Sequence, residues 1–78
     1  MTPTDRVRRI MKDVLGVDDE SLDDEAGMIA DIGADILELV KIAMEIEREF
    51  DIEITEDDEA AACATVGEWI ALVERKLP

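Results

Sequence analysis

The stretch from residue 36 to residue 50 constrains the fold most, because its apolar residues recur at the three- and four-residue spacing of an α-helix. The residues that share one arc of the helical wheel are Leu39, Ile42, Ala43, Ile46 and Phe50. Gly33 provides a tight turn before this stretch, and Asp35 and Glu38 have the spacing of a capping box. The sequence therefore predicts a helix over residues 36–50 with Asp35 as its N-cap.

A second apolar strip lies beside this core arc. Leu37, Val40 and Met44 fall on the same side of the wheel as Ile36, and Glu47 lies next to them. The apolar surface is then about twice as wide as an ordinary surface helix needs. Two interpretations stay open. The strip packs against the preceding loop or another helix, or it is exposed and marks a site for a partner, where methionine suits adaptable binding.

Ile36 is the unusual residue of this helix. The start of a helix favours a small polar side chain, and a β-branched apolar residue there caps nothing. The function of the chain therefore depends on why isoleucine stands at this position.

The N-terminal part predicts another amphipathic helix and then a long connection. Thr4 is the expected N-cap and Gly16 the expected C-terminal stop. The apolar face of this helix consists of Val7, Ile10, Met11, Val14 and Leu15. Residues 17–35 form a loop that is long enough to need anchoring and to hold a short helical turn. Its apolar anchors are Val17, Leu22, Met28, Ile29 and Ile32.

The C-terminal part predicts an extended link, a short helix and a final helix. Ile52 and Ile54 should enter the core, and Thr55 should cap a short helix over residues 56–62. Thr65 and Glu68 have the spacing of a second capping box. The buried face of the last helix should consist of Val66, Trp69 or Ile70, Val73 and Leu77, and Cys63 should be a small buried apolar residue. The predicted fold is a single all-α domain over residues 1–78, a small four-helix bundle with three main helices and a short one.

Charge and composition exclude several functions. The chain has 22 acidic and 8 basic residues, a net charge of −14, which argues against binding nucleic-acid phosphates or anionic membranes and favours basic protein partners. Histidine and tyrosine are absent, so an active site is not expected, and no calcium-loop spacing or other specific metal site occurs. No apolar run is long enough for membrane insertion. A single cysteine favours a reducing compartment, and we expect a cytoplasmic monomer.

The sequence resembles the acyl carrier proteins over nearly its whole length. Residues 31–37, with the letters D-I-G-A-D-I-L, resemble the D-L-G-A-D-S-L signature of that family. Residues 15–17 are similar to the L-G-V ending of its first helix, residues 49–54 to the E-F-D-x-E-I that closes its second, and residues 65–66 to the T-V that opens its last. The resemblance therefore implies the acyl-carrier fold.

In this family a serine after the G-A-D turn carries 4′-phosphopantetheine, whose thiol holds acyl intermediates as thioesters in fatty-acid, polyketide or related lipid synthesis. The implied partners are a phosphopantetheinyl transferase and acyl-transfer or synthase enzymes with basic docking patches. The implied attachment site is residue 36 between Asp35 and Leu37. The residues of the expected partner-binding face are Asp35, Glu38, Val40, Met44, Glu47, Ile54 and Glu56.

This sequence departs from the family pattern at the attachment position. Ile36 has no hydroxyl, so the cofactor cannot be attached there and the chain should be locked in the apo form. Lys41 and Arg48 stand where fatty-acid members tend to be acidic, which indicates a specialised carrier. We favour a serine-to-isoleucine variant of a working carrier. The alternative is a native non-carrier module of the same fold, with an acidic surface for protein interaction or regulation.

Overall fold

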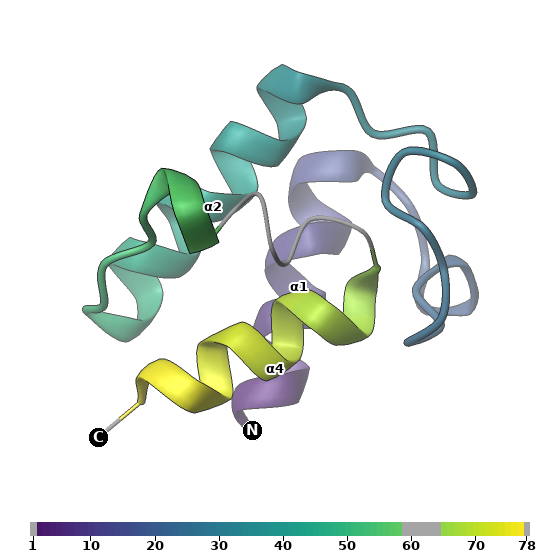
Figure 1. The fold of residues 1–78 in the computed structure, drawn as a ribbon. Helices are drawn as coiled ribbons and strands as arrows, with labels where there is room; N and C mark the ends of the chain where they lie inside the picture. Colours follow the sequence, from purple (N-terminus) through teal and green to yellow (C-terminus); the bar gives the residue numbers. More distant parts are fainter. Residues whose placement is uncertain (1, 59–64, 78) are drawn as a thin grey trace.

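A computed structural model of the chain describes residues 2–58 and 65–77. It contains α1 (Pro3–Leu15), a 3-10 turn η1 (Asp19–Ser21), α2 (Ile36–Phe50) and α4 (Val66–Lys76), and residues 56–58 form a further helical turn. Figure 1 shows these elements with the long loop between α1 and α2 at one side of the molecule. The all-α fold predicted from the sequence is confirmed, and α2 has the predicted bounds.

The first helix begins earlier than the sequence analysis predicted. Thr2, not Thr4, is the N-cap: its hydroxyl accepts the N–H of Asp5 at 3.1 Å, and the Asp5 carboxylate accepts the N–H of Thr2 at 3.4 Å. Pro3 is the first helical residue. The N–H of that position has no partner within a helix, so proline is tolerated there and the residue before it becomes the N-cap. Gly16 ends the helix in the left-handed region with a φ of 69°, as predicted.

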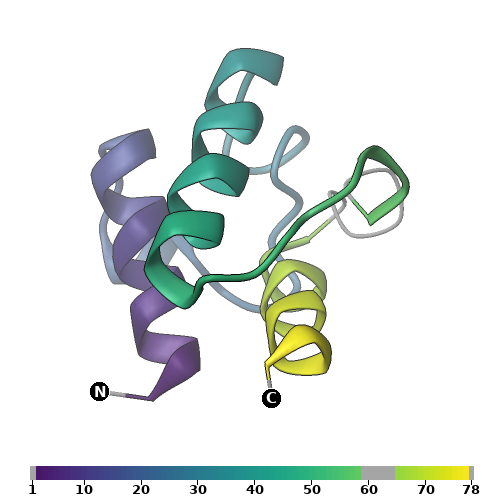
Figure 2. The same ribbon diagram turned by 90° about the vertical axis from the view of Figure 1, so that its left-hand side faces the viewer.

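The core lies between the three main helices. α1 packs against both α2 and α4, and Figure 2 shows α1 and α2 side by side and running in opposite directions. The fully buried side chains are Val7, Met11, Leu22, Met28, Ile42, Ile46, Val66, Trp69, Leu72 and Val73. Trp69 is a core residue as predicted, and α4 buries Ile70 as well.

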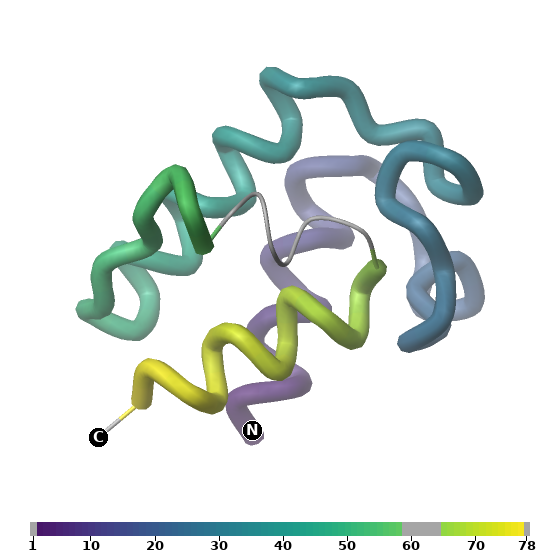
Figure 3. The backbone as a smooth tube through the Cα atoms, viewed as in Figure 1, coloured from purple at the N-terminus to yellow at the C-terminus, as the bar shows by residue number. Residues whose placement is uncertain are grey.

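The long loop passes the end of the molecule where α1 ends and α2 and α4 begin (Figure 3). Leu22 and Met28 are fully buried and Ile32 is half-buried, so these three residues anchor the loop as predicted. Ile29 does not: it is 60% exposed, because its neighbour Met28 takes the inward-facing position.

The start of α4 is docked on this loop through the backbone. The N–H of Val66 donates to the carbonyl of Ala26 at 3.1 Å, and the N–H of Gly67 donates to the carbonyl of Asp24 at 2.9 Å. A helix start has N–H groups without partners inside the helix, and here the loop supplies two acceptors. Thr65 caps the helix through the N–H of Glu68 at 3.1 Å, which is one of the two bonds of the predicted capping box.

The link after α2 runs back along the core. Ile54 is buried and Ile52 half-buried, as predicted. Thr55 and Asp58 form a reciprocal capping pair, with N–H to oxygen distances of 3.0 and 3.1 Å, so Thr55 caps the short helix as predicted. The rest of that helix and Cys63 lie outside the described residues. Within the described part of the chain, no helix has the length and apolarity needed to cross a membrane.

Candidate functional site

The start of α2 is built by a turn and a capping box. Gly33 has a φ of 81°, and the N–H of the next residue, Ala34, donates to the carbonyl of Met28 at 2.9 Å. Asp35 then accepts the N–H of Glu38 at 2.8 Å, and the Glu38 carboxylate accepts the N–H of Asp35 at 3.0 Å. These contacts confirm the predicted cap and fix residue 36 as the first residue of the helix.

Ile36 points away from the core. It is 73% exposed, and its neighbour Leu37 is 74% exposed. Further along the helix, Met44 is 55% and Val40 is 42% exposed. The interpretation that Leu37, Val40 and Met44 pack against the loop or another helix is therefore wrong, and the second apolar strip faces solvent.

Two of the expected partner-binding residues have another role in the fold. After α2, Asp51 adopts the left-handed region with a φ of 54°, and the chain turns back. Ile54 then enters the core, and its N–H donates to the Glu47 carboxylate at 2.9 Å. The burial of Ile54 agrees with its predicted place in the core, and its part in the partner-binding face stays a prediction. Glu47 is half-buried and its carboxylate is bound to the backbone.

The acidic residues near the C-terminal end of α2 are paired within the molecule. Glu49 accepts the Nε of Arg6 at 2.8 Å, and the guanidinium of Arg6 lies 4.4 Å from the centre of the Phe50 ring. Glu45 lies 3.5 Å from Arg48. The contacts of Arg6 tie α2 to α1, and together with the Glu45–Arg48 pair within α2 they partly neutralise this end of the helix.

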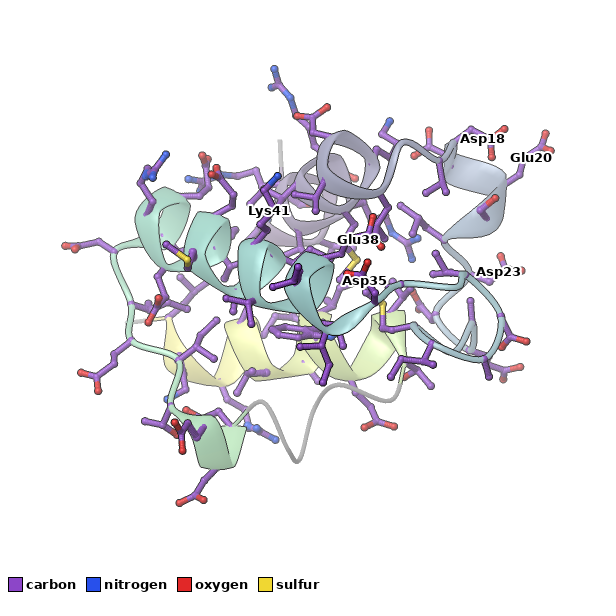
Figure 4. All side chains as sticks on the ribbon, turned by 90° about the horizontal axis from the view of Figure 1, so that it is seen from above. Asp18, Glu20, Asp23, Asp35, Glu38 and Lys41 are labelled. Carbon is purple, nitrogen blue, oxygen red and sulfur yellow. The ribbon has the colours of Figure 1, made fainter. Side chains whose placement is uncertain are left out.

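Figure 4 looks onto α2 from the outside and shows Asp35, Glu38 and Lys41 along it. Glu38 shares this helix with Val40, Met44 and Glu47, so four of the expected partner-binding residues occupy one element. Glu56 is exposed on the separate helical turn at residues 56–58. Among residues 2–58 and 65–77, no group of three or more potential metal ligands gathers.

The comparison with known proteins identifies the family. Residues 5–73 match the family described as the phosphopantetheine attachment site. An acyl carrier protein of Thermotoga maritima is 38% identical over 72 residues, which cover 92% of this chain and 88% of that protein. The chain therefore belongs to the phosphopantetheine attachment-site family, among the acyl carrier proteins, as its resemblance implied.

The cofactor of this family is 4′-phosphopantetheine. The residues at the start of α2 do not fit its attachment, because no side chain between Ser21 and Thr55 carries a hydroxyl. Ser21 lies in η1 with its hydroxyl bonded to Asp18 at 3.3 Å, and the hydroxyl of Thr55 caps the helical turn that follows it. The chain therefore presents a helix start of the carrier type without an attachment oxygen.

Proposed function

We propose that this protein is an acyl carrier domain in which Ile36 occupies the attachment position and holds the domain in the unmodified form. The observation that carries the proposal is an intact carrier-type helix start with a side chain at residue 36 that cannot be modified. The Gly33 turn and the reciprocal cap of Asp35 and Glu38 are intact. The side chain of Ile36 is exposed but has no oxygen. A single serine-to-isoleucine change accounts for this combination.

The domain acts as a partner of enzymes and not as an enzyme itself. In the family, the thiol of the cofactor holds acyl groups as thioesters. What Ile36 leaves in place is the docking surface: the exposed strip on α2 and the acidic residues Asp35 and Glu38 at its start. This surface suits a phosphopantetheinyl transferase and acyl-transfer or synthase enzymes with basic patches. The net charge of −14 opposes self-association, so the domain works as a monomer.

The test is attachment to an Ile36→Ser variant. The variant and the parent are incubated with coenzyme A and a phosphopantetheinyl transferase, and both are weighed by mass spectrometry. Ile36→Ala serves as a matched control that is smaller than isoleucine but still lacks a hydroxyl. The proposal requires that the serine form alone gains the mass of the cofactor. A serine form that stays unmodified with several active transferases contradicts it.

A native interaction or regulatory module is the second candidate function. It is favoured by the exposure of Ile36, which extends the apolar strip to the first residue of α2. In this case Ile36 is itself a contact residue, and its replacement by serine should weaken the complex. Affinity capture at low salt, with the parent and the serine variant side by side, separates the candidates. If the parent captures proteins unrelated to acyl transfer and the serine variant does not, the interaction module is favoured. If both forms capture acyl-transfer enzymes equally, the carrier is favoured.

A further inference from the structure

One exposed ridge of α2 alternates apolar and basic residues. Leu37, Lys41, Met44 and Arg48 follow one another at spacings of four, three and four residues, so their side chains lie in line along one face. Leu37 is 74% and Met44 55% exposed, Lys41 is also exposed, and the Arg48 side chain is 75% exposed. The ridge therefore places a lysine between two exposed apolar side chains.

The carboxylates of this half of α2 are largely occupied inside the molecule. Glu45 is the partner of Arg48, Glu47 binds the N–H of Ile54, and Glu49 is paired with Arg6. Lys41, in contrast, forms no ion pair in the part of the chain that the structure describes, and Glu45, which lines the same hollow, is the partner of Arg48. A cation without a carboxylate in ion-pair contact thus lies on the exposed surface of a strongly acidic protein.

The position of Lys41 limits what can cover the ridge. A surface that buries Leu37 and Met44 also desolvates the lysine between them, and a buried charge without a partner is strongly unfavourable. An entirely apolar surface would leave Lys41 without a counter-charge, and a cation opposite it would be repelled. A second copy of this chain is opposed by the net charge of −14 on each molecule. A carboxylate opposite Lys41 satisfies these constraints.

We propose that the ridge of Leu37, Lys41 and Met44 docks an enzyme surface that places a carboxylate opposite Lys41, between apolar side chains that cover Leu37 and Met44. The inference rests on the proposed function, because the enzyme in question is the one that reaches residue 36. It makes Lys41 a residue that determines specificity. The partner presents basic residues to Asp35 and Glu38 at the helix start and an acidic residue one turn further along.

The experiment measures binding of the phosphopantetheinyl transferase encoded in the same genome. The parent chain is suited to it because Ile36 prevents turnover, so the dissociation constant is measured at equilibrium by calorimetry. The variants are Lys41→Glu and Lys41→Gln. Arg75→Glu is the matched control, because Arg75 is an exposed cation on α4 and its reversal changes the net charge by the same amount. Circular dichroism verifies that each variant is folded.

The expected result is a rise in the dissociation constant of about tenfold or more for Lys41→Glu, a smaller rise for Lys41→Gln and less than about twofold for Arg75→Glu. Unchanged or tighter binding of Lys41→Glu, or equal effects of Lys41→Glu and Arg75→Glu, overturns the inference. The Michaelis constants of the same substitutions in the Ile36→Ser background must follow the same order. An Ile36→Ser form that is never modified contradicts the proposed function instead, so the two failures are distinguishable.

Discussion

The carboxylate of Glu47 accepts the backbone N–H of Ile54 at 2.9 Å, which fastens the returning chain to the last turns of α2. An acidic residue on the outside of a helix would ordinarily be free for a partner. Here it stabilises the path by which Ile54 reaches the core. The acidic character of α2 is thus partly structural, and the surface open to partners is narrower than the sequence indicates.

Replacing Glu47 should therefore lower stability. Glu47→Ala removes the acceptor of the Ile54 N–H, and we expect a loss of about 1–2 kcal/mol in the free energy of unfolding. Glu47→Gln keeps an acceptor oxygen without the charge and should lose less. Urea unfolding measures both. Glu53→Gln, at an exposed position on the same link, is the control and should stay within about 0.5 kcal/mol of the parent. Equal stability of Glu47→Ala and the parent would show that this bond contributes nothing.

A methyl group at Gly67 should also destabilise the fold. A Cβ atom there would lie 2.9 Å from the backbone carbonyl oxygen of Asp24, which cannot move without disturbing the bond that docks α4 on the loop. Alanine usually stabilises a helix relative to glycine. We nevertheless expect Gly67→Ala to lower the free energy of unfolding by about 1–2 kcal/mol, as for overpacked sites. Thermal unfolding gives the sign directly, and a gain in melting temperature would contradict the close approach.

The ion pair between Asp58 and Lys76 should make stability depend on acidity. Their charged atoms lie 2.7 Å apart, and Lys76, followed by the hydrogen bond from Thr55, lowers the pKa of Asp58 from 3.8 to about 2. Because the pKa is lower in the folded state, the contribution is fully present above pH 3.8 and is lost as the pH falls towards 2.

The measurement compares the parent with Asp58→Asn. The parent should be the more stable protein at neutral pH, and the difference in the free energy of unfolding should shrink through the window below 3.8. A constant difference across that window would show that the ionised Asp58 is not responsible.

Screening of the acidic surface should raise stability. Residues 18–59 contain 18 acidic side chains against Lys41 and Arg48, a net charge of 18 − 2 = 16 negative units. Their mutual repulsion opposes the compact state. Salt or millimolar Mg²⁺ should therefore raise the melting temperature by at least about 4 °C, which corresponds to about 1 kcal/mol in a domain of this size. The weakening of exposed ion pairs such as Lys12–Asp19 by salt is a smaller opposing effect. An unchanged melting curve would count against the repulsion.

Local patterns predicted the parts of the fold that depend on local chemistry. The bounds of α2, the Asp35–Glu38 cap and the Gly16 stop followed from periodicity and capping rules. The rule that proline prefers the first helical position could have identified Thr2 as the N-cap. The contact of Gly67 with Asp24 could not be predicted, because it joins segments that are distant in sequence.

The candidate site was predicted only in part, because some of its features depend on contacts between segments that are distant in sequence. Its start, from Gly33 to Leu37, is a local motif and was visible in the sequence. The helical wheel could not decide whether Leu37 and Met44 are exposed, since this depends on where the loop runs. The burial of Ile54, in contrast, was predicted from the alternation of apolar and polar residues in the link after α2.

The most direct test of the central claim compares the Ile36→Ser variant with the parent after incubation with coenzyme A and a phosphopantetheinyl transferase. Because residue 36 is 73% exposed, the substitution should change the free energy of unfolding by no more than about 0.5 kcal/mol, so both proteins are compared in the folded state. Mass spectrometry should show one attached cofactor on the serine form and none on the parent. A parent that gains the same mass, or a folded serine form that gains none, would contradict the assignment of residue 36 as the blocked attachment position.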